Sequence, residues 1–180
     1  MNVGATSETD YGDYFMWGST TPNTKTECNW VNAPFNNGLS DYDAEYFNTH
    51  KSEWLDSKDN LKPEFDAARA IMGGDWRMPT EADFQELVKN TNKEWFTNYN
   101  SSGANGMKFT SKINGNSIFF PTSGVRIDSR IDSASSAYVW IPSLSNDTID
   151  SGIHASFYKG SAYAGYRYPR YGGMTVRGVL

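Results

Sequence analysis

The clearest alternation of hydrophobic and polar positions lies in residues 107–113. Apolar or small side chains, with Ile113 the last of them, alternate there with polar ones, which is the period of a β-strand that buries one face. Asn114-Gly115 follows and is a favoured hairpin turn. Ser117–Phe120 is the returning strand, and Pro121 ends it. This stretch therefore predicts a β-hairpin.

Two helices are predicted ahead of the hairpin. The first begins near Pro63, which suits the first turn of a helix, and ends at Gly73-Gly74. The second begins at Thr80, a good N-cap, and Asp83 three residues later approximates a capping box. The apolar positions that form its buried face are Phe84, Leu87 and Val88.

Three further strands are predicted towards the C-terminus, over residues 136–141, 152–158 and 174–179, with turn-rich loops between them. In the middle strand, alternation predicts that Ile153, Ala155 and Phe157 face the core. The same alternation predicts that three side chains face outward, namely His154, Ser156 and Tyr158.

The first fifty residues are expected to form loops and short strands, including an aromatic strand over Tyr11–Gly18. Residues 29–57 have no clear period and predict a long loop packed by its own aromatic side chains. Helices early and strands late indicate an α+β fold. A length of 180 residues fits one domain spanning residues 1–180.

Residues 138–180 are rich in Tyr, Ser and Gly and contain no Glu. Antibody binding loops use the same residue types, because Tyr is a large, stiff contact and Ser and Gly adapt around it. The chain has a formal charge of −5, yet no acid follows Asp150. The cations there, Lys159, Arg167, Arg170 and Arg177, are too few for a nucleic-acid-binding stripe.

The sequence offers no catalytic constellation. Cys28 is the only cysteine, so an internal disulfide or a thiolate metal site is not expected. His50 and His154 do not stand in a ligand-spaced cluster, and no phosphate-binding glycine loop is present. The acidic stretches at 41–45, 56–60 and 146–150 are interpreted as solvated loops. We therefore expect no catalytic residues, no cofactor and no metal site.

Two tryptophans and one arginine are expected to serve the core. Trp76 and Trp140 could be sugar-stacking platforms, but core packing is the favoured interpretation because large aromatics dominate cores. Arg177 falls in a predicted strand and is expected to be a buried hydrogen-bond donor. No apolar run is long enough to span a membrane, and no signal peptide is recognised. Either a leader has been removed or the protein leaves its cell by another route. The location is left open, and association with a virion or surface display by another route is the favoured expectation.

The run Gly74–Ala82, GDWRMPTEA, resembles segments of the major paralogous domain of Fibrobacter succinogenes and of formylglycine-generating enzymes, both variants of the C-type lectin fold. The first family is the closer, with similar segments in order at 11–18, 114–126, 138–140 and 173–177. The resemblance implies a C-type lectin-like fold, with two helices packed on short antiparallel strands and long loops. Formylglycine-generating enzymes use late cysteines, which this chain lacks, so that activity is not implied.

Many variable proteins of diversity-generating retroelements, in Bacteroides-type bacteria and their phages, also resemble this domain. In that class randomised template adenines diversify a C-terminal face, which the resemblance would place here at about residues 138–171. The implied function is non-catalytic binding of a protein or cell-surface ligand, with no nucleic acid and no membrane insertion, and homo-oligomers are compatible with it. The residues expected to contact ligand are Ile141, Ser143, Asn146, Asp147, His154, Ser156, Tyr158, Tyr163, Tyr166, Arg167, Tyr168, Arg170 and Tyr171.

Two alternatives to the receptor-binding hypothesis stay open. A carbohydrate-binding lectin would bind sugars saturably. A structural component of a bacterial surface assembly would self-associate and keep a constant C-terminal sequence.

Overall fold

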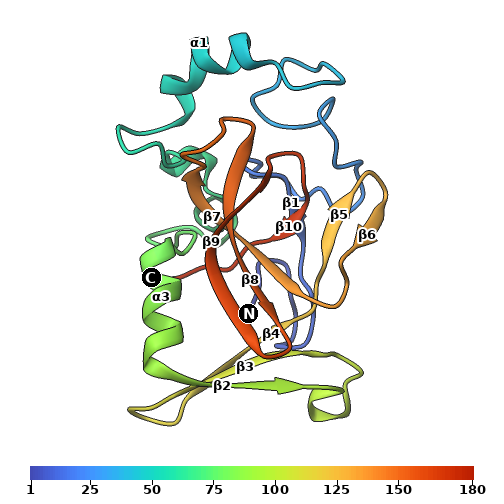
Figure 1. Cartoon of the computed structure of the whole chain (residues 1–180), viewed down its shortest axis with the longest axis vertical. Helices are drawn as coiled ribbons and strands as arrows, with labels where there is room; N and C mark the ends of the chain where they lie inside the picture. Colours follow the sequence, from blue (N-terminus) through green and yellow to red (C-terminus); the bar gives the residue numbers. More distant parts are fainter.

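A computed structural model describes residues 1–180. The chain has a mixed α+β architecture, which confirms the predicted class (Figure 1). Its helices are α1 (Ala44–Trp54), α2 (Ala67–Met72) and α3 (Glu81–Asn90), with 3₁₀ turns at Pro63–Phe65 and Tyr99–Ser101. Its strands are β1 (Tyr14–Phe15), β2 (Thr91–Phe96), β3 (Gly106–Ser111), β4 (Ser117–Pro121), β5 (Val125–Ile127), β6 (Arg130–Asp132), β7 (Ala137–Leu144), β8 (Ser151–Tyr158), β9 (Ser161–Pro169) and β10 (Met174–Thr175).

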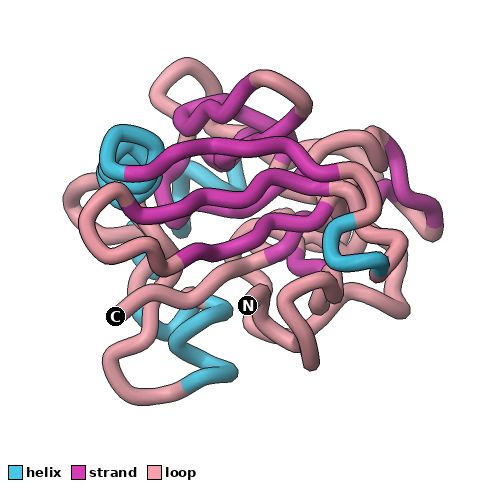
Figure 2. The backbone as a smooth tube through the Cα atoms, turned by 90° about the horizontal axis from the view of Figure 1, so that it is seen from below, coloured by secondary structure: helices cyan, strands magenta, loops and turns pink.

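The strands form three sheets. The largest has the order β1-β10-β7-β8-β9, in which every pair is antiparallel except β10 with β7. β2, β3 and β4 form a second antiparallel sheet, and β5 and β6 form a short hairpin. Figure 1 shows α1 at one end of the molecule and the β2-β3-β4 sheet at the other. Figure 2 shows that sheet face-on, and loops make up much of the remaining chain.

The predicted hairpin is confirmed as β3 and β4, paired from Gly106↔Pro121 to Thr110↔Ser117. Ile113 differs from its prediction, because β3 ends at Ser111 and the Ile113 side chain lies in the turn, 87% exposed. The connection is longer than a two-residue turn, since the Gly115 N–H bonds to the Ser111 carbonyl oxygen.

Both predicted helices are present. The one from Pro63 is a 3₁₀ turn followed by α2, because Asp66 caps the second part through its side chain. It ends at Gly73, whose φ of +74° suits a residue without a Cβ. α3 begins at Thr80 with the complete capping box formed by Thr80 and Asp83.

The long loop predicted for residues 29–57 is wrong in part, because α1 forms within it. Asp43 accepts a hydrogen bond from the Tyr46 N–H and so starts the helix. α1 is mostly polar and buries only Phe47 and Trp54, which is why its apolar periodicity is weak. Strands β2, β5, β6 and β9 were not predicted as strands.

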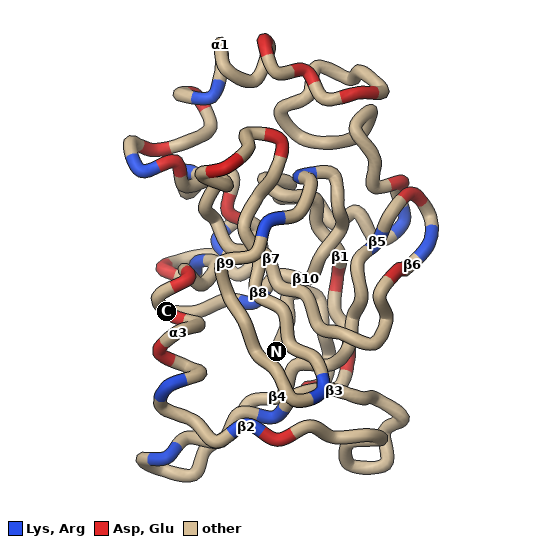
Figure 3. The backbone as a smooth tube through the Cα atoms, viewed as in Figure 1, with Lys and Arg blue, Asp and Glu red and all other residues tan.

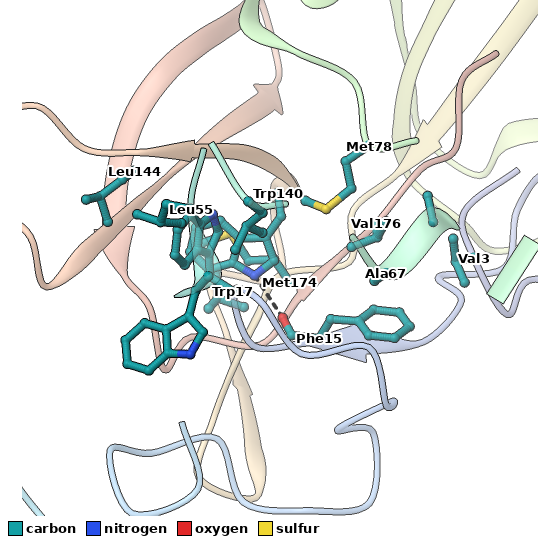
Figure 4. Close-up of a cluster of buried hydrophobic side chains, with 14 of the residues drawn as sticks. Val3, Phe15, Trp17, Leu55, Ala67, Met78, Trp140, Leu144, Met174 and Val176 are labelled. Atoms are coloured by element: carbon teal, nitrogen blue, oxygen red, sulfur yellow. Dashed lines mark hydrogen bonds between the residues drawn. The ribbon is translucent and has the colours of Figure 1, made fainter. Parts of the chain in front are cut away.

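Two hydrophobic cores lie on the two faces of the largest sheet. The first surrounds Trp17 and Trp140, both fully buried (Figure 4). Their indole N–H groups donate to backbone oxygens, that of Trp17 to Ile141 at 3.0 Å and that of Trp140 to Phe15 at 2.8 Å. The burial expected for Trp140 is confirmed, whereas Trp76 is only partly buried.

The second core lies between the largest sheet, α3 and the β3-β4 hairpin. Four phenylalanines meet there with ring centroids between 4.7 and 6.3 Å apart: Phe84, Phe109, Phe120 and Phe157. Contacts of this kind stabilise beyond the apolar area that they bury. This core holds α3 against β8 and β9.

The two ends of the chain lie together. Asn2 forms a bridge with Arg177, and the Val3 N–H donates to the Val176 oxygen at 2.8 Å. Arg177 is buried as predicted and donates to the Phe119 oxygen at 2.9 Å. No helix in the fold combines the length and the apolar character needed to cross a membrane.

Candidate functional site

The aromatic part of the candidate site is the face of β8 and β9 that points away from α3. Residues paired across an antiparallel ladder point to the same side, so Tyr163 shares a face with Ser156, and Tyr166 shares it with His154. Tyr163 and Tyr166 are three residues apart and would face opposite sides of a regular strand. An irregularity between Ala164 and Tyr166 changes the register, and Gly165 occupies it with a φ of +95°. This bulge brings both tyrosines to one face.

Three tyrosines, Tyr158, Tyr163 and Tyr166, form a group that we call the tyrosine cluster. Their side chains are 40%, 42% and 51% exposed. The ring centroids of Tyr158 and Tyr163 are 5.9 Å apart, and those of Tyr163 and Tyr166 are 5.5 Å apart. A solvent-exposed row of aromatic rings is thus built on two paired strands rather than on mobile loops.

Charge is sparse along the strands that carry the cluster. From Ser151 to Pro169 the only charged residues are Lys159, in the β8–β9 turn, and Arg167 (Figure 3). The surface of the tyrosine cluster is therefore aromatic and nearly uncharged, since Arg167 pairs with Ile153 on the opposite face of the sheet.

His154 lies on the same face but beneath the rings. The prediction that it faces solvent is wrong, because its side chain is only 4% exposed. Its ring centroid lies 5.4 Å from that of Tyr138, 6.2 Å from Trp140, and 6.3 Å from both Tyr166 and Tyr168. Burial lowers the pKa of His154 to about 4, and its Nδ1 atom has no hydrogen-bond partner. At neutral pH His154 is a neutral part of the packing.

A polar hollow of about 430 Å³ adjoins the cluster at Tyr166. It brings together five of the residues expected to contact ligand: Ser143, Asn146, Asp147, Tyr166 and Arg167. Lys58 and Glu81 also line it, although they are distant in sequence and were not predicted. The volume falls within the range of small-molecule sites.

The hollow is balanced in charge. Its two cations, Lys58 and Arg167, are matched by the carboxylates of Glu81 and Asp147. Arg167 Nη1 lies 2.9 Å from Asp147 Oδ2, but both side chains are more than half exposed. Such a pair is weak in water, so both groups stay available to a ligand.

Three further predicted contacts are corrected by burial. Ile141 is fully buried because it faces the second core, beside Val139 and Ala155. Ser156 is 5% exposed, since it lies between Tyr138 and Tyr163 on the paired strands. Neither side chain is available to a ligand. The alternation of β8 failed as a guide because both faces of this strand are covered.

Arg170 is the third correction, as its side chain is fully buried. Its Nε donates to the Ile149 oxygen and its Nη1 to the Pro34 oxygen, both at 3.2 Å. The guanidinium lies 4.1 Å from the Phe47 ring centroid, and Trp30 and Tyr42 flank it. Burial lowers the pKa of Arg170 to about 10. Arg170 therefore links the end of β9 to the segment around α1 through its hydrogen bond to Pro34 and its contact with Phe47.

Tyr168 and Tyr171 are half-buried and stand apart from the exposed cluster. Tyr168 packs against the first core, and Tyr171 contacts Trp30 with the ring centroids 5.1 Å apart. Tyr168 and Tyr171 therefore pack within the fold and offer little exposed surface to a ligand. Of the thirteen predicted contacts, the exposed set consists of Asn146, Asp147, Tyr158, Tyr163, Tyr166 and Arg167, with Ser143 partly exposed.

Other reactive side chains lie outside the site. The Cys28 thiol is buried, and burial raises its pKa to about 11. No three side chains among His, Cys, Asp and Glu are grouped so that they could hold a metal ion.

A scan of protein-family models, a search of curated proteins and a search of solved structures found no match to this chain. Function is therefore inferred from the residues of the site itself.

Proposed function

We propose that this protein is a non-catalytic binding protein whose tyrosine cluster and adjoining polar hollow contact a protein or cell-surface ligand. The observation that carries the proposal is the side-by-side exposure of Tyr158, Tyr163 and Tyr166 on paired strands. Exposed aromatic surface of this kind is typical of interaction sites, because Tyr anchors a contact with little loss of conformational entropy.

The residues and strands that hold the tyrosine cluster in place favour a binding role for it over exposure without a function. The strands hold the rings in place. His154 packs against Tyr166, and Tyr168 packs against His154 in turn. A ligand therefore meets rings that are already ordered, which lowers the entropic cost of association. The hollow next to Tyr166 adds hydroxyl, amide and charged groups that give direction to a contact.

The fold that we propose is C-type lectin-like, in keeping with the resemblance of the sequence motifs. Helices α2 and α3, short antiparallel strands and long loops are compatible with it. Within that fold we propose a variable protein of a diversity-generating retroelement. Strands β7 to β9 cover most of residues 138–171, and their exposed positions are free to vary without disturbing either core.

Sequencing the coding region across many isolates, together with its flanking DNA, tests this proposal. We expect substitutions to concentrate at the exposed positions of residues 138–171 and to follow adenines in a nearby, near-identical repeat. Trp140, Ile141 and Arg170 should be constant because they are buried. A uniform C-terminus with neither a repeat nor a reverse transcriptase nearby would remove the retroelement proposal.

A second candidate, glycan binding, is favoured by the polar hollow alone. Its charge balance suits a neutral ligand rich in hydroxyl groups, and Tyr166 offers a ring for stacking. Saturation-transfer NMR with a panel of mono- and disaccharides tests it. Sugar signals that disappear in Asn146→Ala and persist in Tyr158→Ala would support glycan binding in the hollow. The absence of any sugar signal would reject this candidate.

A further inference from the structure

β9 has an outer edge that no other part of the chain covers with hydrogen bonds. It is the last strand of the largest sheet, and β8 is its only partner. From Ser161 to Tyr168 no backbone N–H or oxygen bonds to anything outside the β8–β9 pairing. Alternate backbone groups of β9 therefore point outward without a protein partner, in the pattern that another extended chain would satisfy.

The first half of β9 lacks the features that usually protect an edge. Ser161–Ala164 contains no charged residue and no proline. One of the two outer strands of the second sheet differs, because β2 exposes Lys93 and Glu94. Beyond Ala164, the Gly165 bulge and Arg167 interrupt the edge of β9. The open edge is thus limited to Ser161–Ala164.

A shallow groove runs along this open edge, with α3 as its floor. A hollow of about 260 Å³ there is lined by Val88 and Phe84 of α3 and by Ala162, Tyr163 and Ala164 of β9. The two alanines point towards α3, since they pair with Phe157 and Ala155 on the core side of the sheet. A strand added beside β9 would place small apolar side chains over Val88 and its alternate side chains beside Tyr163.

Lys89 is the only charged residue that lines this hollow, and the carboxylate of Glu81 lies past its far end, beside Gly165. Lys159 lies two residues before Ser161. The complementary chain is one with an acidic residue at this end.

We propose that the Ser161–Ala164 edge binds an extended segment of a protein ligand by strand addition. The segment would alternate small apolar residues, facing α3, with residues that contact Tyr163, and would carry an acidic residue near Lys89. This inference rests on the proposed binding function and adds the form of the ligand to it. It makes the unpaired backbone, and not only the tyrosine rings, the basis of recognition.

Selection from a phage-displayed library of random dodecapeptides, with the full chain as bait, tests the proposal. Enriched peptides are synthesised, and amide hydrogen exchange of the protein is compared with and without them. We expect slower exchange at alternate residues of Ser161–Ala164. No enriched peptide, or protection confined to other residues, would overturn strand addition.

Two proline variants, Ser161→Pro and Ala162→Pro, supply an independent test. Neighbouring residues of a strand direct their N–H groups to opposite sides, so one variant removes an outward N–H and the other a bond to β8. The variant that keeps the wild-type melting temperature should bind the peptide about tenfold more weakly or worse. Unchanged binding by that variant contradicts the proposal, and the exchange experiment decides the matter if neither variant folds.

The tyrosine variants separate this proposal from the broader one. If Tyr158→Ala and Tyr166→Ala weaken peptide binding while the β9 amides stay unprotected, the tyrosine cluster binds and strand addition is wrong. If the β9 amides are protected and both tyrosine variants bind normally, strand addition stands and the tyrosine cluster is not the site. A concentration-dependent dimer with β9 amides already protected would assign the edge to a second copy of the chain and overturn the proposal.

Discussion

His154 shows at the scale of one residue how burial creates a pH dependence. Its pKa is about 4 in the folded chain and 6.5 without burial, because desolvation disfavours the imidazolium. Between about pH 4 and pH 6.5, His154 binds a proton in the unfolded chain but not in the folded chain. Stability from this group is therefore complete above about pH 6.5 and falls as the pH decreases towards 4.

We predict that the free energy of unfolding falls by up to about 3 kcal/mol on this account between pH 7.5 and pH 4. His154→Gln should remove this part of the slope, as measured by urea denaturation at both pH values. His50→Gln is the matched control at the other histidine and should keep the slope. An identical pH dependence in wild type and His154→Gln would contradict the assignment.

Arg170 illustrates a charged residue that serves packing. Arg170→Ala would leave the Ile149 and Pro34 oxygens unpaired and open a cavity beside Phe47. We predict a loss of about 3–4 kcal/mol in the free energy of unfolding, measured by urea denaturation. Arg170→Met fills most of the cavity without supplying donors, so a smaller loss of about 1–2 kcal/mol is expected. Equal stability of Arg170→Ala and wild type would show that this contact does not hold the segment around α1.

At the scale of one element, the hydrogen bonds of Asp83 stabilise the start of α3. Asp83 accepts from the Thr80 N–H at 2.7 Å and from Arg77 Nη1 at 2.6 Å. The Arg77 hydrogen bond, together with those from Thr80, lowers the pKa of Asp83 from 3.8 to about 2. The stability that the ionised Asp83 carboxylate gives the folded chain is present above pH 3.8. It is lost as the pH falls through about 2, since the carboxylate must then be protonated.

Asp83→Ala should therefore destabilise the chain by about 1–2 kcal/mol at pH 7, with the ion pair itself screened because both side chains are about one-third exposed. Thermal unfolding at pH 7 and pH 2 measures the difference, which should shrink at the lower pH. Glu86→Ala on the same helix is the control, with a change below about 0.5 kcal/mol. A deficit that persists unchanged at pH 2 would rule out the charged cap as its cause.

At the scale of the whole molecule, the residues that stabilise the fold are distinct from those of the exposed tyrosine cluster. The two cores, the paired termini and Arg177 involve none of the tyrosine cluster. Replacing Tyr158, Tyr163 and Tyr166 together by Ser should lower the free energy of unfolding by no more than about 1.5 kcal/mol, because each side chain is exposed. Trp140→Ala should cost about 3–5 kcal/mol. Chemical denaturation compares them, and a triple variant as unstable as Trp140→Ala would mean that the cluster is part of the core.

Local interactions were predictable from the sequence alone. The Thr80–Asp83 cap, the β3-β4 hairpin, the glycine end of α2 and the α+β class follow from contacts within a few residues, which any tertiary arrangement preserves. Burial of Trp140 and Arg177 was also predicted, but the same reasoning failed for Trp76, so the tertiary structure decided which of these side chains is buried.

Only the tertiary structure decided which residues of β8 and β9 reach a ligand. His154 and Ser156 fit the outward period of β8, yet neighbouring rings cover them, and covering depends on residues that come from other strands. Lys58 and Glu81 line the polar hollow although they lie outside residues 138–171, and no local pattern in the sequence indicates that placement. The Gly165 bulge, which an isolated glycine in a strand can indicate, turns Tyr166 to the side of Tyr163. Sequence thus determined the local elements, and the packing of distant segments determined the surface that they present.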